Sequence, residues 1–354
     1  VNVITPYSVT ANGHDSVIIK AHIVDKQGNP SMKGITVGWQ TSLGQLSPLP
    51  ISKTDKNGVA EIALTSTQAG TAKVTAMLDA QEFLEADYDI IFTTDVVSPT
   101  YSTLALSPSI ITAGDGTRTY DQSEITVIAK DNQGNLLSGL KDDIKLQYST
   151  QLNIKESKFT ESSTGVYKAT ISAQKMGTTQ IHAIISGVPL TQSVSLTVIP
   201  DNISAKVRDI VISDPTPKAG DTITYTAYLI DKYDNPVSKD TPVTWTSDNV
   251  SVLSSALTFT DDKGVTQTKL TRGPAGLAKV NVNLKSGIYH AKDVNFVADD
   301  VDENRSEITL IPTNIVANGK EKALLSLIIK DKGGNILPDQ QVKGISDNPT
   351  IVFS

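Results

Sequence analysis

Histidine is the side chain most often used for proton transfer near neutral pH, and the chain has four: His14, His22, His182 and His290. A hydrolytic triad also needs a nucleophile and a carboxylate beside its histidine. These histidines share no spacing to a serine or an aspartate, and the sequence has no G-x-S-x-G, H-E-x-x-H or glycine-rich phosphate loop. We therefore predict that the protein is not an enzyme, and we assign no catalytic residue, cofactor-binding residue or cofactor.

Carboxylates are concentrated in two segments where a divalent cation is the chemistry to consider. "ADDVDENRSE" covers residues 298–307, and "AGDGTRTYDQ" at 113–122 holds Asp115 and Asp121. Neither has the D-x-D-x-D-G order of a calcium loop, and the absence of cysteine excludes thiolate sites and disulfides. We interpret the first segment as a solvated linker, with a calcium-stiffened junction as the alternative, and the second as a long turn between strands. No metal-binding residue is predicted.

The charge balance bears on possible partners. The net charge is −7, and the 31 basic residues are spread singly along the chain, so no stripe follows a phosphate backbone. We predict that nucleic acid is not a partner. No stretch approaches the roughly 20 apolar residues of a membrane helix. An export signal or membrane anchor is therefore expected outside this sequence.

A short polar motif recurs along the chain. It reads "DKQGNP" at 25–30, "DNQGNL" at 131–136, "DKYDNP" at 231–236 and "DKGGNI" at 331–336, so the leading Asp returns every 100 to 106 residues. That interval is the size of a small self-contained domain. An Asp that bonds its own backbone, followed by Gly in a left-handed conformation, predicts a tight turn; Asp234 replaces the Gly in the third repeat.

The elements that hold these turns are strands. Alternating apolar segments precede each Asp, at 16–25, 124–131, 222–231 and 323–331, and further strands and turn signals follow every 8 to 15 residues. This pattern predicts an all-β protein made of tandem immunoglobulin-like β-sandwich domains. Trp39 and Trp245 each lie 14 residues after their Asp, within an alternating strand, which favours a core position over an exposed binding anchor.

These motifs together resemble a known family. The sequence combines "TANG", D-x-x-G-N-P, Trp, T-D-x-x-G-V-A and L-T-S-x-x-A-G-x-A-x-V-T-A over residues 5–76, and the third repeat keeps most of this signature. It is similar to the bacterial Ig-like group 1 domains found in tandem in intimin and invasin type adhesins. The second repeat diverges, because Tyr148 replaces the Trp and three residues are inserted before it.

The resemblance implies a function. Such proteins are inverse autotransporters, in which an outer-membrane barrel anchors a surface-exposed array that contributes to virulence. The resemblance implies that this chain is a piece of such an array, as in an enterobacterial adherence factor. It implies a fragment of an adhesin that attaches to a host cell-surface or matrix protein, on the bacterial surface, with the barrel outside this sequence. The alternative is a passive spacer that projects a distal binding tip. An enzyme accessory module would need an aromatic platform, and aromatics are only 5% of the chain.

The repeat spacing predicts four domains, at 1–95, 96–200, 201–300 and an incomplete one at 301–354. Short linkers with Pro99 and Pro200 predict that they are arranged as an elongated rod. The fourth repeat contains only its first strands, so we expect it to be ordered by contacts with the third repeat or with another copy.

Overall fold

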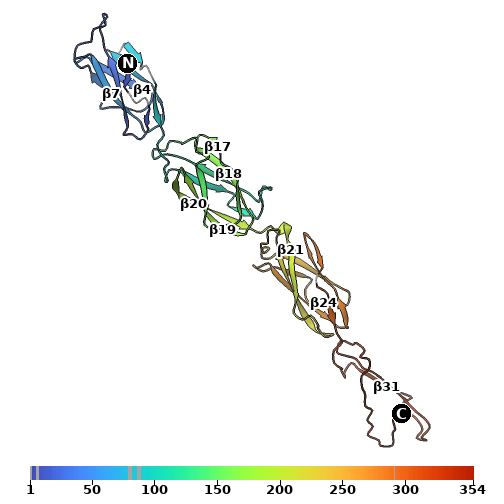
Figure 1. The fold of residues 1–354 in the computed structure, drawn as a ribbon. Helices are drawn as coiled ribbons and strands as arrows, with labels where there is room; N and C mark the ends of the chain where they lie inside the picture. Colours follow the sequence, from blue (N-terminus) through green and yellow to red (C-terminus); the bar gives the residue numbers. More distant parts are fainter. Residues whose placement is uncertain (1, 5–7, 79–81, 86–88, 291) are drawn as a thin grey trace. The chain divides into compact units, whose positions relative to one another are not determined.

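The computed structural model describes residues 2–4, 8–78, 82–85, 89–290 and 292–354. The chain divides into two compact units, residues 1–198 and 199–354, and each is described by itself. Within the described part the only helical element is the 3-10 turn η1 (Asn202–Ser204). The described residues therefore contain no helix long and apolar enough to cross a membrane. The predicted all-β class is confirmed (Figure 1).

The first sandwich is built from strands β1 to β11, at the N-terminal end of the chain. One sheet has the order β1 (Asn2–Ile4), β3 (Ser16–His22), β7 (Val59–Thr65), β5 (Gln45–Ser47). The facing strands form the order β10 (Glu82–Glu85), β9 (Val74–Leu78), β4 (Thr36–Thr41), β6 (Ile51–Lys53), and the shorter order β2 (Ser8–Thr10), β11 (Ile90–Thr93), β8 (Gly70–Ala72). Only the β2–β11 pair is parallel among the described pairs of this sandwich.

The second sandwich repeats the plan with longer strands. One sheet has the order β12 (Thr103–Ser107), β14 (Ser123–Ile128), β18 (Val166–Ala173), β16 (Ile154–Glu156), with β17 (Thr160–Ser163) also paired to β18. The other has the order β13 (Ile110–Thr112), β20 (Val188–Ile199), β19 (Gly177–Ile185), β15 (Ile144–Tyr148).

The third sandwich and a final hairpin belong to the second unit. The sandwich has one sheet of β21 (Lys206–Ile212), β22 (Thr222–Ile230), β26 (Val265–Arg272), β24 (Ser251–Leu253), in that order. Opposite lie β25 (Leu257–Phe259), β23 (Pro242–Ser247), β28 (Val280–Leu284), β29 (Gly287–His290), and the pair β27 (Gly276–Ala278), β30 (Val294–Phe296). The hairpin is β31 (Glu307–Ile311) with β32 (Leu324–Ile328).

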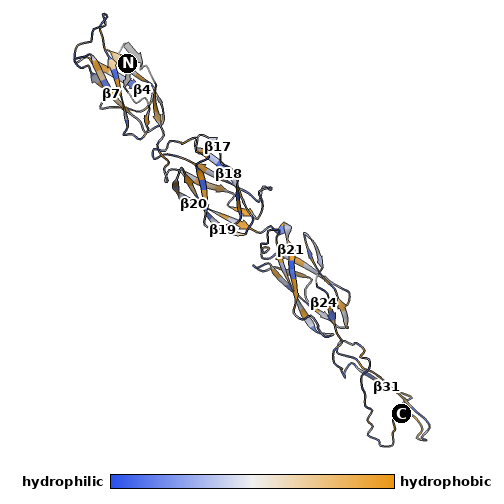
Figure 2. Cartoon of the chain, viewed as in Figure 1, coloured by the Kyte–Doolittle hydropathy of each residue, from blue (hydrophilic) through white to orange (hydrophobic). Residues whose placement is uncertain are grey.

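Each core lies between the two sheets of a sandwich, because every second side chain of a strand points inward. In β3, Val17, Ile19 and Ala21 are buried while their neighbours reach solvent. In Figure 2, hydrophobic and hydrophilic residues are mixed along the strands of each sandwich. The predicted core position of the tryptophans is confirmed, since Trp39 is 2% exposed and Trp245 is 1% exposed.

The recurrent motif connects β3 to β4, β14 to β15 and β22 to β23 in the three sandwiches. Asp25 accepts the backbone N–H of Gln27 at 2.9 Å and of Asn29 at 2.8 Å, both through Oδ1. Gly28 has φ +85°, a left-handed conformation that costs glycine little. In the third repeat Asp234 takes this conformation with φ +63°. The turn chemistry predicted from the sequence is therefore confirmed.

The fourth repeat consists of the β31–β32 hairpin and irregular chain. Every side chain of these two strands is exposed, including Ile308, Leu310, Leu325 and Leu327. Its described contacts with the third sandwich are made by the turn at residues 331–335 and its flanks. Contact with the third repeat was one of the two sources of order expected from the sequence.

Candidate functional site

The histidines considered in the sequence lie apart in the structure. His14 is exposed in a turn, and His22 and His182 are exposed on β3 and β19. The side chain of His290 lies outside the described residues. The three described histidines belong to two different sandwiches, and two of them are on the outer faces of strands, so they form no common site.

The second acidic segment is a turn between β13 and β14, as the sequence indicated. Asp115 accepts the hydroxyl of Thr117 at 2.7 Å, and Asp121, which is buried, accepts the backbone N–H of Arg118 at 3.0 Å. Among the described residues, no three His, Cys, Asp or Glu side chains are grouped so as to hold a metal ion. The carboxylates of this turn stabilise its backbone.

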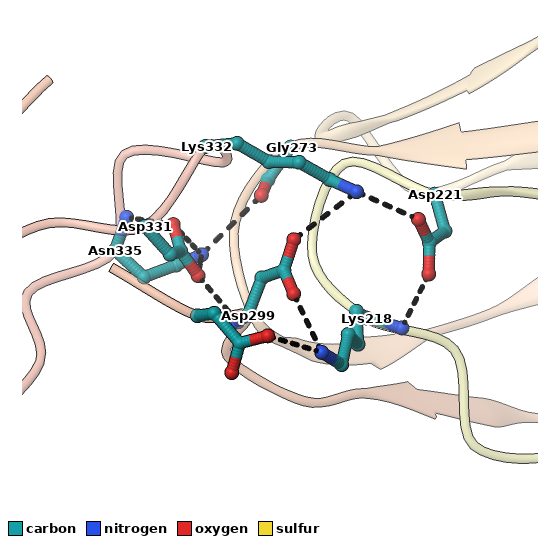
Figure 3. A network of polar contacts seen from close by, with 8 residues as sticks. Lys218, Asp221, Gly273, Asp299, Asp331, Lys332 and Asn335 are labelled. Atoms are coloured by element: carbon teal, nitrogen blue, oxygen red, sulfur yellow. Dashed lines mark hydrogen bonds and ion pairs between the residues drawn. The ribbon is translucent and has the colours of Figure 1, made fainter. Parts of the chain in front are cut away.

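The residues that do converge lie where the fourth repeat meets the third sandwich (Figure 3). Asp331 leads the fourth copy of the motif and is completely buried. Its Oδ1 accepts the N–H of Asn335 at 2.8 Å, as in a simple turn, while its Oδ2 accepts the N–H of the linker residue Asp299 at 2.8 Å. Burial opposes ionisation of this carboxyl, but the N–H groups of Asp299 and Asn335 outweigh it and hold the pKa of Asp331 below its usual range.

Asn335 connects the same turn to a loop of the third sandwich. Its Nδ2 donates to the Asp331 carboxylate at 2.8 Å, which fixes the orientation of the amide. Its Oδ1 then accepts the N–H of Ala275 at 2.6 Å, and Nδ2 also reaches the carbonyl of Gly273 at 3.4 Å. The partners on the third sandwich are backbone groups of the loop between β26 and β27. The turn thus recognises a backbone conformation.

A chain of ion pairs surrounds these hydrogen bonds (Figure 3). Lys332 Nζ lies 2.9 Å from Asp221 Oδ1 and 3.1 Å from Asp299 Oδ2. Lys218 Nζ lies 2.9 Å from Asp299 Oδ1 and 3.0 Å from Asp300 Oδ2. Hydrogen bonds from Lys218 first, then from the Asp300 N–H and Lys332, lower the pKa of Asp299 far below its usual range. The same pairs raise the pKa of Lys218 and Lys332.

The interpretation of residues 298–307 as a solvated linker is therefore wrong for Asp299. Its side chain is only 13% exposed, whereas that of Asp300 is 94% exposed. The linker residue is covered because its backbone N–H must reach the buried Asp331 and its carboxylate lies between two lysines. A charge run indicates solvation on average, but local partners decide each residue.

The hydrogen bond from linker to motif recurs in the other repeats. Asp131 Oδ2 accepts the N–H of Asp95 at 3.1 Å, and Asp231 Oδ2 accepts the N–H of Asp201 at 3.0 Å. Asp131 and Asp231 are both fully buried. Asp131, Asp231 and Asp331 thus each hold the chain segment that leads into their own repeat.

The amide bridge also recurs within the first unit. Asn135 Oδ1 accepts the N–H of Ala69 at 2.9 Å, and Asn135 Nδ2 donates to the carbonyl of Thr67 at 3.0 Å. Thr67 and Ala69 lie in the loop between β7 and β8, which corresponds to the β26–β27 loop of the third sandwich. The same pair of side chains therefore joins the first sandwich to the second and the third to the fourth repeat.

The sequence showed these residues but not this role. The turn needs Asp and a left-handed residue, and the third repeat does without Gly. Asn at the fifth position is present in all four copies, although a turn does not require it there. Two signals in the sequence could have identified the junction. One is this Asn, and the other is the "AG" pair that follows the L-T-S or L-T-R segment in the first and third repeats.

Glycine at position 333 is required by the close approach of two backbones. A Cβ on Gly333 would lie 1.9 Å from the carbonyl oxygen of Gly273 and 2.9 Å from the Cβ of Ala219. We expect Gly333→Ala to displace the fourth repeat from the third sandwich and to free the Asp299 amide for hydrogen exchange. The matched control is Gly273→Ala, whose Cβ would meet only the Gly333 carbonyl oxygen, at 3.8 Å. Equal rates of hydrogen exchange at the Asp299 amide in the two variants would contradict the close approach of these backbones.

The junction carboxylates predict a pH dependence. The pKa values of Asp131 and Asp331 are lowered in the folded chain, so each contributes stability that is complete above the unfolded pKa of about 3.9 and is lost as pH falls through the lower folded value. We expect the junction to persist at neutral pH and to loosen below about pH 3.9. Amide NMR shifts of Asp95 and Asp299, followed from pH 7 to pH 2, should change with a midpoint below about 3.9, because the folded carboxylates have a lowered pKa. A midpoint above the ordinary Asp value would contradict the prediction.

Comparison with known proteins places this architecture. The model for the bacterial Ig-like domain (group 1) matches residues 2–93 and 213–297, half of the chain, and the model for invasin domain 3 matches residues 98–201. The chain belongs to the bacterial Ig-like domain (group 1) family. The divergent second repeat is the part that matches the invasin domain 3 model, which agrees with the departures seen in its sequence.

Two curated relatives and one solved structure extend the comparison. The inverse autotransporter adhesin YeeJ of Escherichia coli K12 is 26% identical over 349 residues, which is 93% of this chain and 14% of that protein. Invasin of Yersinia enterocolitica is 28% identical over 189 residues, 53% of this chain and 21% of that protein. The structure of FdeC, an E. coli adhesin, covers 84% of this chain and 96% of its own, with 22% identity and a TM-score of 0.53.

These findings confirm the resemblance to intimin and invasin type adhesins and the immunoglobulin-like fold. The chain spans about a seventh of the length of one curated relative and a fifth of the other. YeeJ and FdeC are adhesins by name, and the third protein is named invasin.

Proposed function

We propose that this family member is a surface-exposed part of a bacterial adhesin that attaches the cell to host cells or to extracellular matrix. The observation that carries the proposal is the similarity to an inverse autotransporter adhesin along 93% of the chain. The partner is a host cell-surface or matrix protein. The proposed location is the bacterial surface, with anchorage in the outer membrane through a region outside this sequence.

The passive spacer remains a second candidate because a specific observation favours it. Between the first and second sandwiches, and between the third sandwich and the fourth repeat, the Asp and Asn of the motif bond to the backbone of a linker and of a loop. These bonds hold the linker and the loop in fixed positions. Such bonds make neighbouring domains resist bending, which is what a spacer requires. Adhesin and spacer are compatible with one fold, since binding residues on sandwich domains lie in loops and exposed strands.

Direct binding separates the two candidates. The purified 354-residue chain, fluorescently labelled, is titrated onto epithelial cells and onto an array of matrix proteins in physiological salt. Saturable binding that unlabelled chain displaces, and that protease treatment of the cells abolishes, supports the adhesin. Binding that rises linearly with concentration on every surface supports the spacer and contradicts the adhesin proposal for this part of the protein.

We also propose the domain boundaries 1–95, 96–200, 201–300 and 301–354. They are supported by the strand sets of the three sandwiches, which end at Thr93, Ile199 and Phe296, and by the ends of the family matches. Limited proteolysis should cut at these linkers before it cuts within a sandwich.

An elongated arrangement is a further prediction from the repeat spacing and the short linkers. With strands spanning roughly 25 to 35 Å in each domain, three whole domains in line should exceed about 100 Å. Small-angle X-ray scattering of the chain should therefore give a maximum dimension above this value. A distance distribution typical of a compact globule would contradict the prediction.

A further inference from the structure

The first repeat carries a complete copy of the junction motif whose counterparts are occupied in the later repeats. Asp25 Oδ1 holds the turn N–H groups, and Asn29 Nδ2 donates to Asp25 Oδ2 at 3.0 Å. These bonds match those of Asp131 with Asn135 and of Asp331 with Asn335. The amide and the carboxylate are therefore already oriented as they are in the formed junctions.

The motif of the first repeat differs from the others because no other part of the described chain covers it. All six residues of 25–30 are exposed, whereas Asp131, Asp231 and Asp331 are completely buried. Among the described residues, Asp25 Oδ2 accepts a bond only from Asn29, and no donor reaches Asn29 Oδ1. Two oriented acceptors and one amide donor thus face solvent.

These groups define the chemistry of their partner. In the later repeats the carboxylate takes an N–H from an entering linker, as from Asp95 and Asp299. The amide takes one loop N–H and gives a bond to a carbonyl two residues earlier, as with Ala275 and Gly273. Because all three partner groups are backbone atoms, the surface recognises a loop conformation and tolerates many side chains.

We propose that Asp25 and Asn29 form a docking surface for the C-terminal end of another Ig-like domain attached on the N-terminal side of the first sandwich. The linker N–H must come from the segment that enters the sandwich, because the donors in the other repeats lie 30 to 36 residues before their Asp. The proposal goes beyond attachment to a host and does not depend on it.

A second copy of the chain is a poorer occupant. Its β7–β8 loop is already bonded to Asn135 and its β26–β27 loop to Asn335. A domain joined in series presents a free loop of this type together with the linker. The curated relatives also contain far more sequence than the region matched here.

A fusion tests the proposal on the full chain. In the fusion, residues 201–306 are duplicated directly before Val1. The copy of Asp299 then precedes Asp25 by 32 residues, which is the same separation as between Asp299 and Asp331 in the chain itself. The chain lacks cysteine, so Lys269→Cys in the copy and Lys53→Cys in the first sandwich supply two unique spin-label positions. Both lysines are exposed on strands. The expected result is a narrow distance distribution by pulsed electron resonance.

Matched variants show whether the motif causes the ordering. Asn29→Ala in the fusion should broaden the distribution, while Asn57→Ala should not, because Asn57 makes the same kind of bond to Asp55 in an exposed turn of the same sandwich. Hydrogen exchange of the paired amides of β3 and β7 reports whether the first sandwich remains folded. If Asn29→Ala unfolds it, Ala275→Pro in the copy removes the partner N–H instead and should broaden the distribution.

Two results would overturn the proposal. A broad distribution in the unsubstituted fusion would show that the domain does not dock. Equal distributions for Asn29→Ala and Asn57→Ala, with the sandwich folded, would show that the motif is not the contact. Distances between the spin labels that change with protein concentration would indicate association between copies. This result would also contradict docking in series.

Discussion

Replacing Trp245 with Ala is expected to unfold the third sandwich while the first two remain folded. Trp245 lies at the centre of the core, with its ring centroid 6.5 Å from that of Tyr225 and its Nε1–H donating to Thr258 Oγ1 at 2.8 Å. Loss of a large buried aromatic side chain costs about 3 to 5 kcal/mol of unfolding free energy, a large part of the stability of a domain of this size. Differential scanning calorimetry should show one transition lost or moved to much lower temperature.

The control for this prediction lies one residue away. Thr244 is exposed on the same strand, β23, so Thr244→Ala should leave every transition close to its original temperature. Trp39→Ala should act in the same way on the first sandwich, where Trp39 donates to Ser52 Oγ at 2.8 Å. If Trp245→Ala left the third-sandwich transition unchanged, the tryptophan would not be a structural core residue.

Local sequence patterns were sufficient to predict the fold. Period-2 alternation placed Val17 and Ile19 in a core, and the Asp and Gly of the motif defined the turn, because both signals depend only on neighbouring residues. The tryptophans were predictable for the same reason, since they occur within an alternating strand at a constant distance from the turn.

The aromatic residue in the core of the second sandwich could not be predicted from local sequence patterns. Its strand has Tyr148 in place of Trp, and Tyr148 is only partly buried. The buried aromatic ring is supplied instead by Tyr167 on β18, at the position of Ala60 and Thr266, and its hydroxyl donates to the Leu137 carbonyl at 2.6 Å. This exchange between facing sheets was not predictable, because it depends on which strands pack together.

The junction was missed for a related reason. Asp299 looked like one of several solvated acidic residues, but its neighbours Lys218 and Lys332 are distant in the sequence. Likewise Asn135 bonds to residues 66 and 68 positions away. Charge and turn rules describe a segment by itself, so they cannot show which backbone groups of an adjacent domain a side chain will meet.

The second large effect is expected for Asp131→Asn, which should release the first sandwich from the second. Four N–H donors converge on this buried carboxylate: those of Asp95, Gln133 and Asn135, and the Asn135 side-chain amide. An amide at position 131 has one oxygen, so its NH₂ must face the donors from Asp95 and Asn135. A buried donor left without an acceptor costs about 1 to 3 kcal/mol. The Asp95 amide should then lose its protection from hydrogen exchange.

Asp25→Asn in the same chain is the matched control that isolates the junction. Asp25 makes the same turn bonds, but it is exposed and, within the described residues, receives no linker N–H. Water can solvate the donor that the substitution leaves unpaired there, so its cost should be much smaller. The difference between the two variants in unfolding free energy therefore measures what the linker and burial add to an otherwise identical turn. Equal costs would mean that the motif acts only as a turn, and that the hydrogen bond from Asp95 adds nothing to the connection between domains.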